Sequence, residues 1–425
     1  MRVIWRAGVA SLRTRAVGLA NPEFTKLWIG QSVSLVGDQV TLLALPLTAV
    51  TLLSASPFQM GLLAAAEAAP WLIVSLPAGA WVDRLPRKRI LIVANVGRAG
   101  LLVSIPIAAT LGQLRIEHLY IVGALLGTLN ILFSTAVQAF TPSFIGRSEL
   151  VAANTRMQIS SSLAQSGGPG LAGILVQRLS APAALSVDAA SFLLCALLIF
   201  WIKLPDTPSS SGRRRALASE ILEGINWLVR NPILRALVLN VANFSLAFNM
   251  VSAIYVLYLT RELDLSPAVL GVIVAMRGVG SVVGSIAVLG WAGKLGTGRS
   301  LLSATGLGSA GLLLVPIADG PSAALMLAFG QFAFGIGMPL FSVYQTSLRM
   351  ALTPDQLQGR VTASFRFFAQ GPAPLGALLG GALGAALGLR PAILLGAVCA
   401  VIAIVWLVAS PVRRLAALPT AAAPN

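Results

Sequence analysis

The sequence has very little charge. Only 10% of its 425 residues are Asp, Glu, Lys or Arg, whereas 56% are hydrophobic. A soluble domain carries roughly a quarter of its residues as charged side chains, which cover its surface in water. A chain with so little charge cannot build such a surface. We therefore expect an integral membrane protein, most of whose surface contacts lipid.

Reactive and metal-binding side chains are also scarce. Cys195 and Cys399 are the only cysteines and both lie inside apolar runs, which argues against a disulfide framework or a metal site in the loops. The single histidine, His118, has no obvious nucleophile as a partner, and a Gly-x-x-x-x-Gly-Lys phosphate loop is absent. A membrane-embedded enzyme is therefore poorly supported, and we expect neither a cofactor nor a metal.

Acidic residues are fewer than basic ones, and the net charge is +16. The basic residues lie in short loops between apolar runs, not along a continuous polar face, which argues against nucleic-acid binding. Of the 30 Lys and Arg residues, 24 lie in the terminal segments and in the loops on one side of the apolar runs, and 4 on the other side. Because Lys and Arg accumulate on the cytoplasmic side, we expect a multi-pass protein of the cell membrane with both termini in the cytoplasm. The basic loops can also contact anionic lipid headgroups there.

Apolar runs long enough to cross a bilayer, which takes about 20 residues, occur twelve times. In the first half of the chain they cover 27–53, 58–82, 90–111, 119–140, 156–177 and 183–203. In the second half they cover 232–259, 267–290, 300–318, 322–345, 361–388 and 391–410. Glycines weaken the fifth and the eleventh run. The pattern predicts an all-α membrane protein with twelve transmembrane helices.

A polar segment divides these runs into two groups of six. The predicted parts are a basic cytoplasmic arm (1–26), an N-terminal six-helix bundle (27–204), a cytoplasmic linker (205–231), a C-terminal six-helix bundle (232–410) and a cytoplasmic tail (411–425). The linker carries Leu217, Ile221, Ile225 and Leu228 at helical spacing, which predicts an amphipathic helix on the membrane surface. We favour a connecting role for it over a regulatory one.

The two halves resemble each other. A shift of 210 residues places Gly61 on Gly271, Trp81 on Trp291 and Glu67 on Arg277, the last pair differing in the sign of its charge. Because six spans keep the same orientation in each half, the expected repeat is parallel, with a pseudo-two-fold axis along the membrane normal. This architecture is typical of transporters.

Charge is concentrated in the loop "GAWVDRLPRKR" after the second predicted span. Its conspicuous residues are Gly79, Asp83, Arg84, Arg87, Lys88 and Arg89. The loop resembles the signature loop of the major facilitator superfamily. The segments "NPEFTKLWIGQSVSLVGDQV" and "GINWLVRNPILRAL" resemble its drug:proton antiporter branch, which includes the enterobactin exporter.

That resemblance implies a gating role for the loop. In the family, the residue that matches Asp83 caps a neighbouring helix and latches the two halves in the outward-facing state. The eleventh predicted span begins on the same side, and its N-terminus would favour a carboxylate. The second repeat has Gly293 at the matching position, so only the first loop can form this latch. The alternative is that the cluster only fixes the topology.

The fifth predicted span contains "GPGLAG", which is similar to the antiporter motif of efflux members. The residues concerned are Gly168, Pro169, Gly170 and Gly173, whereas Ala172 replaces the first glycine of the usual closing pair. The resemblance therefore implies export by antiport.

Three ionisable residues are predicted at mid-membrane. Asp38 lies roughly 17 Å along a helix from Lys26, and Glu67 and Arg277 occupy similar depths. Such groups are costly in the bilayer and tend to face a cavity, so we expect a role in proton coupling or substrate binding. The alternatives are hydrogen bonds from Ser34 and Thr41 to Asp38, and neutralisation of the other two within their own bundles. Nearer the predicted span ends lie Arg98, Asp188 and Arg366, which we expect to extend toward the interface.

These features predict a secondary active transporter. The favoured function is proton-coupled export of an amphipathic small molecule, drug-like or siderophore-like, by alternating access in a monomer. Uptake or facilitated transport of a small polar metabolite is the alternative.

Overall fold

The computed structural model describes residues 21–143, 145, 149–203 and 217–417, and within this part it is all-helical. Most of the predicted N-terminal arm, the start of the linker and the end of the predicted C-terminal tail lie outside the described residues. The first half consists of α2 (Pro22–Thr51), α3 (Pro57–Ala68), α4 (Pro70–Arg84), α5 (Arg87–Thr110), α6 (Ile116–Phe140), α7 (Leu150–Leu179) and α8 (Ala181–Phe200). The second half consists of α9 (Leu217–Arg230), α10 (Pro232–Arg261), α11 (Pro267–Leu295), α12 (Thr297–Ile317), α13 (Ala323–Ala351), α14 (Gln358–Gln370), α15 (Pro372–Leu387) and α16 (Leu389–Val408).

The first helix of each half begins in the same way. The Asn21 side chain accepts hydrogen bonds from the backbone N–H groups of the second and third residues of α2, and Asn231 does the same for α10. In both helices proline follows, at the first helical position, where its missing N–H is not needed. These two caps are 210 residues apart, which is the predicted repeat distance.

Ten segments in the described part of the chain are long and apolar enough to cross a membrane. They lie on α2, α3 with the start of α4, α5, α6, α8, α10, α11, α12, α13 and α16. The predicted fifth and eleventh runs are not among them. Helix α7 carries many serines and glycines, and the eleventh run is divided between α14 and α15.

Two of the predicted runs are broken by proline. The second run becomes α3 and α4 at Pro70, and the eleventh becomes α14 and α15 at Pro372. Proline lacks a backbone N–H and its ring clashes with the carbonyl four residues earlier, so one helix ends and another begins. The first break lies directly after Glu67 and therefore affects how that side chain is presented.

The packing of helices within each half follows one scheme. In the first half α2 packs against α7 and α8, and α5 packs against α6 and α8. In the second half α10 packs against α15 and α16, and α12 packs against α13 and α16. The buried apolar side chains of the largest cluster come from both halves, so the core continues across the boundary between them.

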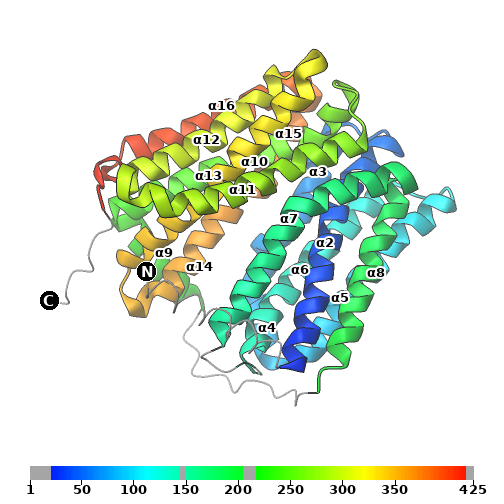
Figure 1. Cartoon of the computed structure of the whole chain (residues 1–425), viewed down its shortest axis with the longest axis horizontal. Coiled ribbons are helices and arrows are strands. Elements are labelled where there is room, and N and C mark those ends of the chain that lie inside the picture. Colours follow the sequence, from blue (N-terminus) through cyan, green and yellow to red (C-terminus); the bar gives the residue numbers. More distant parts are fainter. Residues whose placement is uncertain (1–20, 144, 146–148, 204–216, 418–425) are drawn as a thin grey trace, which may run out of the picture.

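The two halves meet along two glycine-lined seams. A Cβ added to Gly173 of α7 would lie 2.5 Å from the Pro267 oxygen and 3.1 Å from the Gly271 Cα of α11. A Cβ on Gly61 of α3 would lie 2.7 Å from the Gly381 Cα of α15. Figure 1 shows α3, α7, α11 and α15 meeting at one end of the molecule, whereas the halves diverge toward the end that carries α9 and the start of α2. We call this second end the linker end.

The helix expected in the linker is present as α9, and it packs against α14. Leu228 is only 1% exposed, and an ion pair joins Glu223 to Arg360 of α14. A Cβ on Gly224 would meet the Arg360 oxygen at 2.6 Å. The described part of the apolar stripe thus contacts protein, and contact with the membrane surface stays a prediction.

Candidate functional site

A cavity of about 440 Å³ lies between the two halves. Its polar lining includes Asp38, Gln39, Thr41, Glu67, Asn130, Asp188, Ser252, Tyr255 and Arg277. Its apolar lining includes Leu42, Leu43, Met60, Leu63, Trp71, Leu126, Phe192, Phe248, Val256 and Val274. Both halves contribute, so any relative motion of the halves would change the shape of the cavity.

The structure brings together the three residues that the sequence placed at mid-membrane. Asp38 of α2, Glu67 of α3 and Arg277 of α11 all line the cavity. Their roles in coupling or substrate binding remain a prediction, but the shared location is a property of the structure.

Glu67 is positioned by the close approach of α6. A Cβ on Gly127 would lie 2.5 Å from the Glu67 oxygen, and a Cβ on Gly123 would lie 3.0 Å from its Cγ. Two glycines on one face of α6 therefore let the end of α3 lie directly on this helix. Glu67 is an exposed residue, and it lines the cavity.

Arg277 is oriented by partners in its own half. Its Nε donates a hydrogen bond of 3.0 Å to Gln331 of α13. Its guanidinium carbon lies 5.5 Å and 5.3 Å from the ring centroids of Phe248 and Phe334, which themselves stack at 5.3 Å. Stacking on aromatic faces holds a cation in place without removing its charge.

A second group of ionisable residues lies beside Asp38, and the sequence prediction for it is wrong. We expected Arg98 and Asp188 to extend toward the interface, but their exposures are 2% and 0%. Arg98 lies about 17 Å from the start of α5, and Asp188 about 18 Å from the end of α8. Both are thus close to mid-helix, because α5 and α8 begin three and two residues before the apolar runs from which their depth was judged.

Arg98 is held by neutral partners. It donates hydrogen bonds to Asn130 at 2.8 Å and to Asn95 at 2.5 Å. Its guanidinium carbon lies 4.3 Å from the Phe133 centroid and 4.1 Å from the Phe192 centroid. Asn95 lies one turn before Arg98 on the same helix. A polar residue at this spacing is the feature of the sequence that would have indicated an internal arginine.

Asp188, and not Asp38, accepts the hydrogen bond of the Thr41 hydroxyl. The Thr41 hydroxyl donates to Asp188 Oδ2, and Ser191 donates to Asp188 Oδ1 at 2.8 Å. Within the described part of the chain, the Asp38 carboxylate has no hydrogen-bond partner. The alternative in which Thr41 neutralises Asp38 is therefore wrong for this conformation.

The basic loop lies at the linker end, away from the cavity. Arg87 donates a hydrogen bond of 2.7 Å to the Ala139 carbonyl near the end of α6, and Lys88 donates one of 2.7 Å to the Ile202 carbonyl after α8. Both cations thus bind carbonyls at helix C-termini, where a positive charge is favourable. The side chain of Asp83 lies outside the described set, and its latch role stays a prediction. Of the other loop residues, Gly79 lies in α4, where a Cβ would meet nothing, and Arg84 and Arg89 are exposed.

The antiporter-like motif lies on α7, between the cavity and the seam. Pro169 lines the cavity, and its carbonyl would lie 2.3 Å from a Cβ on Gly271. A Cβ on Gly168 would lie 2.6 Å from Gln39, whereas one on Gly170 would meet nothing. The motif therefore permits the close packing of α7 on α11, where Gly173 faces the Pro267 carbonyl and the Gly271 backbone.

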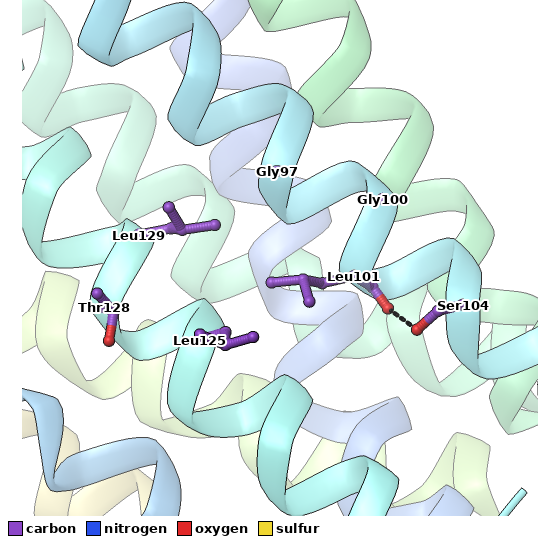
Figure 2. Close-up of a pocket in the computed structure, with 7 residues that line it drawn as sticks. All are labelled: Gly97, Gly100, Leu101, Ser104, Leu125, Thr128 and Leu129. Carbon is purple, nitrogen blue, oxygen red and sulfur yellow. Dashed lines mark hydrogen bonds between the residues drawn. The ribbon is translucent and has the colours of Figure 1, made fainter.

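A second hollow, between α5 and α6, lies on the outside of the first half (Figure 2). Gly97, Gly100, Leu101, Ser104, Leu125, Thr128 and Leu129 line it. Its polar side chains are engaged locally, since Ser104 bonds the Leu101 carbonyl at 2.6 Å. This hollow has no charge and does not share the chemistry of the central cavity.

Comparisons with known proteins agree on one family. The MFS_3 family model, described as "Transmembrane secretion effector", matches residues 14–424. The multidrug efflux pump Tap of Mycolicibacterium fortuitum is 26% identical over 381 residues, which cover 85% of this chain and 91% of Tap. The enterobactin exporter EntS of Salmonella typhi is 25% identical over 390 residues, covering 89% of both chains.

The fold likewise matches solved transporters. A crystal structure of a mutant of the nucleoside transporter NupG superposes with a TM-score of 0.78 at 10% sequence identity, covering 91% of this chain and 99% of NupG. These matches bear out the resemblance noted in the sequence, and the family and its relatives are transporters, not enzymes. The chain therefore belongs to the transmembrane secretion effector family of the major facilitator superfamily.

Proposed function

We propose that this protein is a secondary active transporter that exports an amphipathic small molecule in exchange for protons. The observation that carries the proposal is the cavity between the two halves, where Asp38, Glu67 and Arg277 share one chamber with aromatic and aliphatic walls. Apolar walls with a few polar groups are typical of small-molecule sites, and ionisable groups inside a membrane protein commonly belong to substrate or ion pathways.

The proposed architecture is twelve transmembrane spans in two six-helix bundles, with α9 in the cytoplasmic linker between them. Supporting it, the Asn-Pro helix starts recur after 210 residues and the helix pairings of the first half recur in the second. The excess of Lys and Arg on one side favours cytoplasmic termini in the cell membrane. One chain surrounds the cavity, which favours a monomer as the transporting unit, and the basic loops favour contacts with anionic lipids.

We propose that transport occurs by alternating access, which the same geometry supports. The seams of glycine and backbone lie at one end, and the halves diverge at the linker end (Figure 1). With the linker in the cytoplasm, this conformation is open toward the cytoplasm. A transport cycle would then open the seams and close the linker end, where Asp83 is proposed to act as the latch.

Export is favoured over uptake by two observations. The relatives that match along most of the chain include an efflux pump and an enterobactin exporter. The "GPGLAG" motif also resembles that of antiporters, and it lies where α7 contacts α11. The likeness to NupG concerns the fold alone.

Proton coupling is proposed for Asp38. This carboxylate faces the cavity and, within the described residues, has no hydrogen bond that would fix it in the ionised form. Desolvation disfavours the charged state of a carboxyl group, so the group can take up a proton from one side and release it on the other.

The function is tested by the accumulation of amphipathic compounds in cells with and without the gene. The panel should contain lipophilic cations and catecholate siderophores. Export predicts lower accumulation of at least one compound in expressing cells, and a protonophore should abolish the difference. Higher accumulation of a small polar compound in expressing cells would instead favour uptake and contradict the proposal.

A further inference from the structure

Three ionisable residues lie together where α2 and α5 pack on α8: Arg98 and Asp188 are buried, and Asp38 is partly buried. We propose that Asp38, Asp188 and Arg98 form one unit that holds a single exchangeable proton, with the negative charge kept on Asp188 and the proton taken up by Asp38. The inference rests on the proposed proton coupling and adds two residues to it. Asp188 and Arg98 act through Asp38 and are positioning residues.

Arg98 supplies a fixed positive charge. Two aromatic rings, Phe133 and Phe192, cover its guanidinium, and the side chains of Asn95 and Asn130 accept its hydrogen bonds. These partners are all neutral, so they orient the cation without compensating its charge. The charge is compensated by the two nearby carboxylates, Asp38 and Asp188, with which it interacts electrostatically.

The hydrogen bonds around Asp188 favour its ionised form. Both of its carboxylate oxygens accept a hydrogen bond from a hydroxyl, one from Thr41 and one from Ser191. Acceptance of hydrogen bonds favours the charged form of a carboxylate. The helix of Thr41 comes close enough for this contact because residue 37 is glycine, at which a Cβ would lie 2.1 Å from Asp188 Oδ1.

Asp38 is the exchangeable member. It lines the cavity and is only partly buried, whereas Arg98 is 2% exposed. A proton from water in the cavity can therefore form the O–H bond on Asp38 and can return to that water when the bond breaks. Asp188 also lines the cavity, but it is 0% exposed, and a proton on either of its oxygens would displace the hydroxyl of Thr41 or Ser191.

The charges determine how many protons the unit holds. Two carboxylates and one guanidinium carry a net charge of minus one when both acids are ionised. They are neutral when one acid is protonated. Because an uncompensated charge away from water is disfavoured, the resting unit holds one proton.

Arg98 also has an N–H group that makes no hydrogen bond and could donate to Asp38 once Asp38 is deprotonated. Its Nε–H is buried without a hydrogen-bond partner. When the proton leaves Asp38, this N–H is available to the new carboxylate, provided that a rotamer change brings the two groups together. Release of the proton would thus draw the Arg98 side chain of α5 toward α2, and both of these helices pack on α8.

Other charged groups near the unit are few. Glu67 of α3 and Arg277 of α11 line the same cavity, and the thiol of Cys195 lies 3.6 Å from the Asn95 amide nitrogen. The remaining charged residues of α2, α5 and the helices packed against α2, α5 and α8 lie toward helix ends: Glu23, Lys26, Asp83, Arg84, Arg87, Lys88, Arg89, Glu117, Arg156, Arg178, Arg235 and Arg261. Glu67 is therefore the one further acid whose titration must be separated from that of the unit.

The inference is tested by infrared difference spectroscopy of the purified full-length protein in detergent, which counts protonated carboxyl groups during a pH titration. All variants are made in a Glu67→Gln background, with Asp319→Asn, an exposed acid, as a control. The parent should show one buried carboxyl band that titrates, and Asp38→Asn should lack it. Asp188→Asn should also lose the band at neutral pH, since Arg98 then compensates Asp38 alone.

Removal of the cation gives the complementary test. Arg98→Gln should show a second protonated carboxyl band, because two acids remain without a counter-ion. The double variant Arg98→Gln with Asp188→Asn should return to one band. Thr41→Val keeps all three charges, so it tests the unit even if Asp188→Asn does not fold. The variant removes a hydrogen bond to Asp188, so part of the protonated-carboxyl band should then come from Asp188.

An Asp38 band that titrates at the same pH in the parent, in Asp188→Asn and in Arg98→Gln would overturn the shared site. The spectra require no transport, so this outcome would leave the export proposal standing. Absence of proton-driven efflux in the wild-type protein, together with the expected spectra, would instead reject the proposed function.

Discussion

A single methyl group at Gly173 should shift the protein between its two conformations. The Cβ of Gly173→Ala would lie 2.5 Å from the Pro267 oxygen and 3.1 Å from the Gly271 Cα, and both are backbone atoms that cannot rotate away. Overpacking of this kind costs about 1–3 kcal/mol. A conformation in which α7 and α11 separate would avoid the cost. The population open at the seam should therefore rise by roughly 5- to 150-fold relative to the present conformation.

Double electron–electron resonance can measure this shift. Spin labels are placed at Leu179 and Glu262, exposed positions beside the seam, after the native cysteines are replaced by alanine. Gly173→Ala should add or enlarge a long-distance component. Gly170→Ala is the matched control, since its Cβ would meet nothing within 4 Å. Identical distance distributions for the two variants would refute the assignment of the seam as the closed side of the cavity.

Two further predictions concern the loop and the charges across the cavity. Asp83→Asn should raise cytoplasmic labelling of a cysteine at Leu42 by about two- to fivefold, since a charge–dipole contact of about 0.3–1 kcal/mol is lost; unchanged labelling and transport would leave the loop as a topology signal only. Glu67→Gln and Arg277→Gln should each reduce transport more than the double variant does, with a coupling of about 0.5–3 kcal/mol. Strictly additive losses would mean that each residue acts within its own half.

The helical architecture could be predicted from the sequence because the features that specify it are local and occur in both halves. Apolar runs of bilayer length predicted the helices, and α2 and α10 begin at the Asn-Pro pairs that lie 210 residues apart. Gly61 and Gly271, aligned by the repeat, both occupy seams between the halves. The mid-membrane depth of Glu67 and Arg277 predicted that each would face a cavity, and both line the same one.

The buried charge cluster could not be located in the same way. Asp188 receives its hydrogen bonds from Thr41, 147 residues earlier, and from Ser191 on the next turn. Whether an intramembrane arginine extends to the interface or stays inside depends on the helices around it. For Arg98 those are α6 and α8, which supply Asn130 and the two aromatic rings. Only the packing of distant segments reveals such partners.

The ends and breaks of the helices could be predicted from the sequence only in part. Pro70 and Pro372 interrupt spans, but other prolines, such as Pro46 and Pro77, lie within continuous helices. The local sequence identifies a candidate break, and the surrounding packing decides whether the chain bends or stops. The docking of α9 on α14 also depends on such packing, since the fit requires Gly224 against the Arg360 backbone.

The central claim is that Asp38 carries the coupling proton, and proton flux measures it most directly. Wild-type protein and Asp38→Asn are reconstituted in proteoliposomes that contain a pH-sensitive dye, with a compound identified in the accumulation assay. The wild type should move protons when the compound is added and should drive efflux from an imposed pH gradient. Asp38→Asn should do neither, although it keeps the side-chain shape and can retain binding. Full gradient-driven efflux by Asp38→Asn would contradict the account and shift the assignment to Glu67.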